Sequence, residues 1–127
     1  MFYKYISFCS INMVRIFIDG VFDYVHKGHR EHFDRVKHLY DDVHLIVGII
    51  SDDECTEYKR KPAMNQRIRL ELVSKDKHVD GCLVTPLIIT REFIEDHEID
   101  FVYHAFANSK DEFKQSECFE IPRQMGI

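Results

Sequence analysis

The sequence lacks an excess of positive charge, a long apolar segment and closely spaced cysteines. Its 17 Lys and Arg residues are outnumbered by 22 Asp and Glu residues, which gives a formal net charge of -5. A protein that follows a nucleic-acid backbone needs clustered basic residues, so a nucleic acid is not an expected partner. The longest apolar stretch, 45–50, is far shorter than the roughly 20 residues that cross a bilayer, so no membrane span is expected.

The four cysteines are scattered along the chain, and no C-x-x-C pair indicates a zinc or redox centre. Free thiols are typical of a reducing compartment, so the sequence predicts a cytoplasmic location. The chain also lacks repeats, low-complexity tracts and proline- or glycine-rich linkers, and its 127 residues suit one domain. We expect residues 13–127 to form that domain. Residues 1–12 make a poor signal peptide and are expected to be an N-terminal extension, which can be disordered as chain ends often are.

Two apolar runs are typical of buried strands. The first, 14–18, is rich in β-branched residues and ends at Asp19 and Gly20, and the second is 43–50. Strands this apolar suit the buried middle of a parallel sheet. Between them, apolar residues recur at helical spacing: Phe33, Val36, Leu39 and Tyr40. The segment 14–50 is therefore predicted to be a strand, helix and strand in succession.

The alternation continues downstream, where Asn65 and Thr90 can each cap a helix. The first of these helices carries Ile68, Leu72 and Val73, and the second carries Phe93 and Ile94. Short strands are expected at 81–84 and 100–103. This pattern predicts an α/β fold, a Rossmann-like doubly wound parallel sheet in a single domain. Ligands of such sheets bind beyond the carboxyl ends of the strands, which places the expected site in the loop from Asp19 to His26.

That loop contains the motif His26-Lys27-Gly28-His29 at the point where the first helix is expected to begin. Two imidazoles, backbone N–H groups and the positive end of a helix would meet there, and Gly28 lets the backbone approach an anion closely. The motif therefore predicts a phosphate site. Two alternatives remain open: a pair of surface histidines beside a turn, and a zinc site made with His32. The zinc site needs a further ligand that the sequence does not nominate, and no metal ligand is assigned.

The segment 19–29, DGVFDYVHKGH, resembles the signature of choline-phosphate and ethanolamine-phosphate cytidylyltransferases. Glycerol-phosphate cytidylyltransferases are similar. The resemblance covers roughly residues 14–104, through matches at 45–48, 51–53, 58–59, 64–65, 69, 79–80, 90, 92–93 and 99–102. A chance four-residue motif would not be followed by such an ordered series.

The resemblance implies an enzyme that transfers CMP from CTP to a small phosphorylated alcohol and releases pyrophosphate. Phosphocholine or phosphoethanolamine is the expected acceptor, and glycerol 3-phosphate is a further possibility. The resemblance assigns catalytic roles, chiefly charge stabilisation on the phosphates, to His26, His29, Lys59 and Arg123. Mg²⁺ is expected to accompany CTP. A homodimer is expected because 77–80 resembles a segment at the family's subunit contact, although an ordinary helix-to-strand connection explains it equally well.

The same resemblance implies nucleotide-binding roles for Gly20, Val21, Phe22, Gly28, Arg69 and His104, and a role in holding the acceptor head group for Asp19. Each of the polar residues also has a purely structural interpretation. Lys59 could belong to a solvated run of charges, Arg69 could pair with a surface acid such as Glu71 or Asp76, Asp19 could form a turn, and His104 could simply end a strand.

The sequence departs from the family at three places. Ala105 and Phe106 stand where an aspartate pair is usual, and Leu87 stands where the choline and ethanolamine enzymes have tryptophan, which this chain lacks. The final motif is represented only by 123–127, without the hydroxyl residues that should follow. These departures keep two other functions open. One is a degenerate, non-catalytic relative that binds nucleotide or forms a dimer, and the other is an adenylyltransferase.

Overall fold

The structure, a computed structural model, describes residues 13–58, 60–104 and 116–127. In chain order the elements are β1 (Val14–Gly20), α2 (Lys27–Lys37), β2 (Val43–Ile50), α3 (Asp52–Tyr58), α4 (Gln66–Ser74), β3 (Gly81–Thr85), α5 (Arg91–Asp96), β4 (Phe101–Tyr103), the 3-10 helix η1 (Ser116–Phe119) and α7 (Glu120–Met125).

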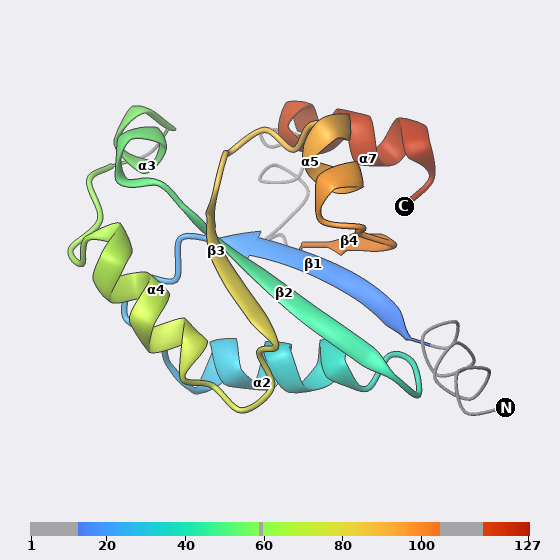
Figure 1. The fold of residues 1–127 in the computed structure, drawn as a ribbon. Coiled ribbons are helices and arrows are strands. Elements are labelled where there is room, and N and C mark those ends of the chain that lie inside the picture. Colours follow the sequence, from blue (N-terminus) through green and yellow to red (C-terminus); the bar gives the residue numbers. More distant parts are fainter. Residues whose placement is uncertain (1–12, 59, 105–115) are drawn as a thin grey trace, which may run out of the picture.

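The four strands form one parallel sheet in the order β3-β2-β1-β4. β1 pairs with β2 along its whole length, from Val14 opposite Val43 to Gly20 opposite Ile49. Figure 1 shows α2 and α4 on one face of the sheet and α5 and α7 on the other. Because the chain leaves β1 toward β2 and returns to the other side of β1 as β4, the sheet is doubly wound, and the predicted Rossmann-like α/β fold is confirmed.

Alternate residues of the central strands supply two separate cores. Ile16 and Ile18 belong to a cluster with Phe33 of α2 and Val73 of α4. Phe17, between them, belongs to a second cluster that includes buried residues of α5 and η1. Successive side chains of a strand point to opposite faces, so a strand covered by helices on both sides must be apolar at nearly every position. This requirement explains the two strongly apolar runs in the sequence.

The first helix ends earlier than its apolar spacing suggests. α2 stops at Lys37, so Leu39 and Tyr40 lie in the following turn and are 46% and 39% exposed. The ring of Tyr40 stacks on that of Phe101, with 5.5 Å between centroids, instead of facing the sheet from a helix.

The buried face of α4 also differs from the expected one. Asn65 caps the helix by accepting the N–H of Ile68, as predicted, but Ile68 and Leu72 are exposed. Arg69 and Val73 are the buried residues of this helix. A guanidinium takes the place that the sequence pattern gives to an aliphatic side chain, because it finds hydrogen-bond acceptors there.

Cys55, Cys82 and Cys118 are free thiols, as predicted, and burial raises the pKa of Cys82 to about 11. Within the part of the chain that the structure describes, no helix has the length and apolar character to cross a membrane.

Candidate active site

A pocket of about 350 Å³ lies beyond the carboxyl ends of β1 and β2. It is bordered by the loop after β1, the start of α2, helix α3 and the segment after β3. The lining residues include these six of the predicted site: Gly20, Val21, Phe22, His26, His29 and His104. The volume falls within the range of small-molecule sites, and the position is the one expected for a ligand of a doubly wound sheet.

The two histidines of the motif form the first turn of α2. His26 is the N-cap residue, and its Nδ1 accepts the N–H of Gly28 at 3.0 Å. In return, Nδ1 of His29 accepts the N–H of His26 at 3.2 Å, and the two rings stack with 4.0 Å between centroids. Since both Nδ1 atoms accept hydrogen bonds, each neutral ring has its proton on Nε2. Two N–H donors are thus available at the positive end of a helix, an arrangement suited to phosphate oxygens.

The electrostatic surroundings keep His29 neutral. Partial burial, followed by the nearby charges of His26 and His32, lowers the pKa of His29 below its usual value of about 6.5. At neutral pH this side chain therefore acts as a hydrogen-bond donor and not as a full positive charge. The structure does not favour the zinc alternative, because no three His, Cys, Asp or Glu side chains among the described residues are grouped so as to hold a metal.

Gly28 leaves space for the capping ring of His26. A Cβ atom at this position would lie 2.8 Å from Cε1 of His26 and 3.1 Å from its Nδ1. The ring of His26 would have to move away, and the hydrogen bond that caps α2 would be lost. Glycine therefore keeps the imidazole in its capping position as well as leaving the backbone open to a ligand.

Asp19 and His104 meet where β1 and β4 end side by side. Nδ1 of His104 lies 2.9 Å from Oδ1 of Asp19, and the side chains are 15% and 1% exposed. Because β1 and β4 lie at the point where the strand order reverses, the pair is at the position where such sheets bind ligands. His104 lines the pocket, whereas Asp19 is buried and is not among the lining residues.

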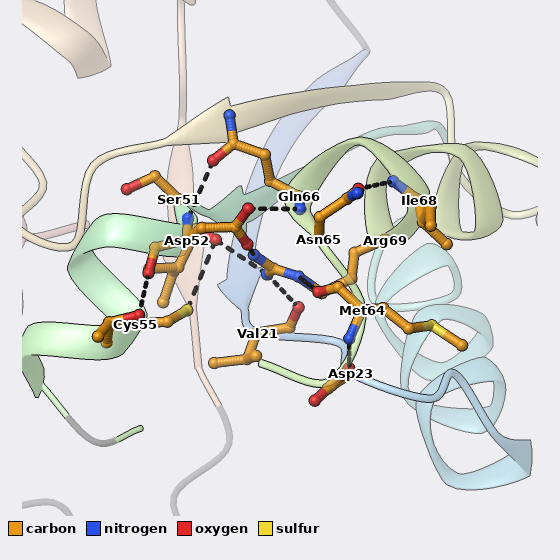
Figure 2. Close-up of polar contacts among 12 residues, drawn as sticks. Val21, Asp23, Ser51, Asp52, Cys55, Met64, Asn65, Gln66, Ile68 and Arg69 are labelled. Carbon is orange, nitrogen blue, oxygen red and sulfur yellow. Dashed lines mark hydrogen bonds and ion pairs between the residues drawn. The ribbon is translucent and has the colours of Figure 1, made fainter. Parts of the chain in front are cut away.

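Arg69 organises the backbone around the pocket, as Figure 2 shows. It is fully buried, and its guanidinium donates to the carbonyls of Met64 (3.0 Å), Val21 (2.8 Å) and Ile50 (2.9 Å) and to Oδ1 of Asp52 (2.6 Å). The alternative of a surface ion pair with Glu71 or Asp76 is wrong, because Glu71 pairs with the exposed Arg67 and Asp76 with His78. The network joins three loops, and one of its partners, Val21, lines the pocket. Direct contact between Arg69 and a nucleotide stays a prediction.

The carboxylate of Asp52 completes this network. Its Oδ2 accepts the N–H of Gln66 at 3.1 Å, and its own N–H donates to Oε1 of Gln66 at 2.9 Å. Slight burial raises the pKa of Asp52, but the hydrogen bonds from Arg69 and Gln66 prevail and hold it below its usual value. The start of α3 is thereby tied to the start of α4.

Asp23 fastens the loop before α4 to the loop before α2. Its carboxylate accepts the N–H groups of Ala63 at 2.7 Å and Met64 at 3.0 Å. Slight burial acts in the opposite direction, but these two hydrogen bonds lower the pKa of Asp23. The sequence analysis did not single out Asp23, although it lies within the signature segment, because its partners are about 40 residues away.

Two predicted catalytic residues are not among the residues that line the described pocket, for different reasons. Lys59 lies outside the described residues, as do Ala105 and Phe106. Arg60, next to Lys59, does line the pocket. Arg123 is exposed on α7 and borders a separate hollow that shares only His104 with the pocket. Catalysis by Lys59 and Arg123 therefore stays a prediction.

The structure adds a contact that the sequence analysis did not anticipate. Glu54 of α3 lines the pocket, and one of its carboxylate oxygens accepts the N–H of Leu87. Tyr58 and Leu87 lie on the same wall. No local signal marks Glu54, because it is one of three consecutive acidic residues at the start of a short helix.

Comparison with known proteins identifies the family of this chain. A family model described as cytidylyltransferase-like matches residues 17–117. A probable choline-phosphate cytidylyltransferase of Schizosaccharomyces pombe is 42% identical over 92 residues, which are 72% of this chain and 25% of that protein. Choline-phosphate cytidylyltransferase A of Homo sapiens is 37% identical over the same share of each chain. Ethanolamine-phosphate cytidylyltransferase of Mus musculus is 33% identical over 93 residues, which are 72% of this chain and 22% of that protein.

The chain thus spans about a quarter of the length of these curated relatives. Among solved structures, the lipopolysaccharide core biosynthesis protein of Thermoplasma volcanium superposes with a TM-score of 0.71 over 90% of this chain and 89% of that one. At 24% identity this likeness concerns the fold alone. On the family match and the sequence identities, the chain belongs to the cytidylyltransferase-like family.

Proposed function

We propose that this chain transfers CMP from CTP to a small phosphorylated alcohol and releases pyrophosphate. The observation that carries the proposal is the stacked pair of His26 and His29, which offers two Nε2–H donors at the start of α2 inside a pocket at the carboxyl end of the sheet. The names of the relatives support phosphocholine or phosphoethanolamine as the acceptor.

In the proposed step, an oxygen of the acceptor phosphate attacks the α-phosphorus of CTP. The new P–O bond forms as the bond to the pyrophosphate oxygen breaks, and pyrophosphate leaves with the electron pair. His26 and His29 would donate hydrogen bonds to the phosphate oxygens, where charge develops. Lys59 and Arg123 are proposed to hold further phosphate oxygens. Mg²⁺ would arrive with CTP and neutralise the triphosphate, since the described residues offer no cluster that could hold the ion by themselves.

A homodimer and a cytoplasmic location are proposed together with this activity. The exposed apolar side chains of Ile68 and Leu72 on α4 lie one helical turn apart and would suit a subunit contact. Asp80, in the segment expected to make that contact, is already bound to Lys37 at 2.6 Å and to the N–H of Leu45 at 2.8 Å. Sedimentation equilibrium of the wild type and of Leu72→Glu would test the dimer.

A second candidate function is a non-catalytic relative that binds nucleotide. It is favoured by the position of Arg123, which is exposed on α7 and borders a hollow other than the pocket. If Arg123 does not hold the triphosphate, the turn from His26 to His29, called the histidine turn below, would still bind nucleotide, but CMP would not be transferred.

Pyrophosphate release distinguishes these functions. The assay would combine Mg²⁺ and each of CTP, ATP, GTP and UTP with phosphocholine, phosphoethanolamine or glycerol 3-phosphate. We expect release that requires CTP and falls about 10²- to 10³-fold in His29→Ala, the usual effect of removing one donor to developing charge. His38→Ala is the matched control, because His38 is exposed just beyond α2. Release with ATP alone would indicate an adenylyltransferase, and CTP binding without release would indicate the non-catalytic relative.

A further inference from the structure

The wall of the pocket formed by α3 differs in charge from the wall formed by α2. Figure 1 shows α2 along one face of the sheet and α3 beyond the carboxyl end of β2. From α2 and the preceding turn come His26 and His29, and from α3 comes the half-buried Glu54. The pocket therefore has hydrogen-bond donors on one wall and a carboxylate on another.

Glu54 has one carboxylate oxygen without a hydrogen bond to the described residues, unlike the other carboxylate in the lining. Each oxygen of Asp23 already accepts one N–H group, from Ala63 or from Met64. In Glu54, Oε2 accepts the N–H of Leu87, and Oε1 makes no hydrogen bond to the residues that the structure describes. The contact with Leu87 holds the carboxylate in place against the pocket, so a ligand donor would meet a preorganised acceptor.

The surroundings of Glu54 are suited to a small cationic group. Tyr58 and Leu87 line the pocket together with Glu54. The same three residues also line an adjoining hollow, to which Glu57 contributes. The pocket lining thus combines a carboxylate with an aromatic and an aliphatic side chain. An ammonium group that keeps N–H bonds would make a charge-assisted hydrogen bond to Oε1. A quaternary ammonium has no such donor, so it gains only the charge attraction and any contact with aromatic faces.

We propose that Glu54 determines acceptor specificity by binding a protonated amine at the end of the acceptor opposite to its phosphate. The preferred substrate is then a phosphorylated amino alcohol with a primary ammonium, such as phosphoethanolamine, in preference to the quaternary phosphocholine or the uncharged glycerol 3-phosphate. This inference rests on the proposed function, because it assumes that the acceptor phosphate lies near the histidine turn.

The test compares kcat/KM for the three acceptors in the wild type, in Glu54→Gln and in Glu57→Gln. The amide oxygen of the first variant can still accept the N–H of Leu87, so the local structure is retained while the charge is removed. Glu57 is exposed and lies only in the adjoining hollow, which makes its variant a matched control. We expect Glu54→Gln to lower kcat/KM for phosphoethanolamine about 10- to 100-fold, as for loss of a charged hydrogen bond. The value for glycerol 3-phosphate and the KM for CTP should not change.

Equal effects of Glu54→Gln on all three acceptors, or a wild-type preference for phosphocholine that the variant retains, would overturn the inference. Isothermal titration calorimetry of acceptor binding distinguishes failure of this inference from failure of the proposed function. If the wild type releases no pyrophosphate with any acceptor, the proposed activity fails. Binding of phosphoethanolamine that Glu54→Gln weakens and Glu57→Gln does not would still support the role of Glu54, whereas absence of binding would refute it.

Discussion

Replacement of Arg69 by methionine should loosen three loops at once. The guanidinium donates to the carbonyls of Val21, Ile50 and Met64 and to the carboxylate of Asp52, all within 3.0 Å. Methionine fills much of the same volume but donates no hydrogen bond. Three carbonyls, that of Ile50 in a buried contact and those of Val21 and Met64 in partly buried ones, would lose a donor, and Asp52 would lose its ion-pair partner.

The size of the effect follows from burial. Removing one partner of a buried ion pair costs about 3–5 kcal/mol, because the remaining charge is left without compensation. The side chain of Asp52 is 36% exposed and can be rehydrated, which reduces the cost to the lower end of that range. We therefore expect the free energy of unfolding to fall by about 3 kcal/mol, or about 10 °C in melting temperature for a domain of this size. The variant should still fold, since small domains have stabilities of about 5–15 kcal/mol.

Urea unfolding followed by circular dichroism measures this loss, with Arg67→Met as the matched control. Arg67 lies on the same helix, but its side chain is 86% exposed and only approaches Glu71 at 3.6 Å. Its replacement should change stability by less than about 0.5 kcal/mol. Arg69→Lys should resemble Arg69→Met, since a single ammonium cannot serve acceptors on three loops. Equal unfolding midpoints for Arg69→Met and Arg67→Met would refute the reasoning.

Two further predictions concern stability. Gly48→Ala should lower the free energy of unfolding by about 1–3 kcal/mol, because the new Cβ would lie 2.6 Å from Cζ of Phe17. The control is Gly81→Ala, which should unfold at nearly the wild-type urea concentration, because the nearest atoms to its new Cβ are at 3.9 Å. Similar losses of stability in both variants would contradict the packing argument. Acidification should destabilise the fold in two stages, measured as urea midpoints from about pH 8 to about pH 3. The fold lowers the pKa of His29, so the unfolded chain is protonated first and stability is lost below about pH 6.5. The lowered pKa of Asp23 adds a second loss as the pH falls below its usual 3.8, and a rise in stability on acidification would contradict both assignments.

The sheet could be predicted because its signals are local. A strand buried on both faces must be apolar at nearly every position, and β1 and β2 carry that signal at most of their residues. Asn65 and Thr90 cap α4 and α5 through contacts three residues away. In contrast, α3 is seven residues long, begins with three acidic residues and buries only Cys55. No periodicity marks it, and its position depends on the contact of Asp52 with Arg69.

The candidate site also combines residues whose positions the sequence could predict with residues whose positions it could not. The histidine turn was predictable because His26, Gly28 and His29 make their hydrogen bonds within three residues, so the motif contains its own geometry. The position of Arg123 was not predictable, since only the packing of α7 decides which hollow it borders. The sequence also gave no reason to connect Glu54 with Leu87, which are 33 residues apart.

By itself the sequence determined the α/β alternation, the buried strands and the histidine turn, because apolar periodicity, capping and a four-residue motif act over short distances. The tertiary structure alone decided which distant residues surround that turn. Arg69 reaches Val21 across 48 residues, and Asp23 reaches Ala63 across 40. Such contacts form only when the sheet brings the carboxyl ends of its strands together, and a buried polar side chain then takes whichever acceptors the fold supplies.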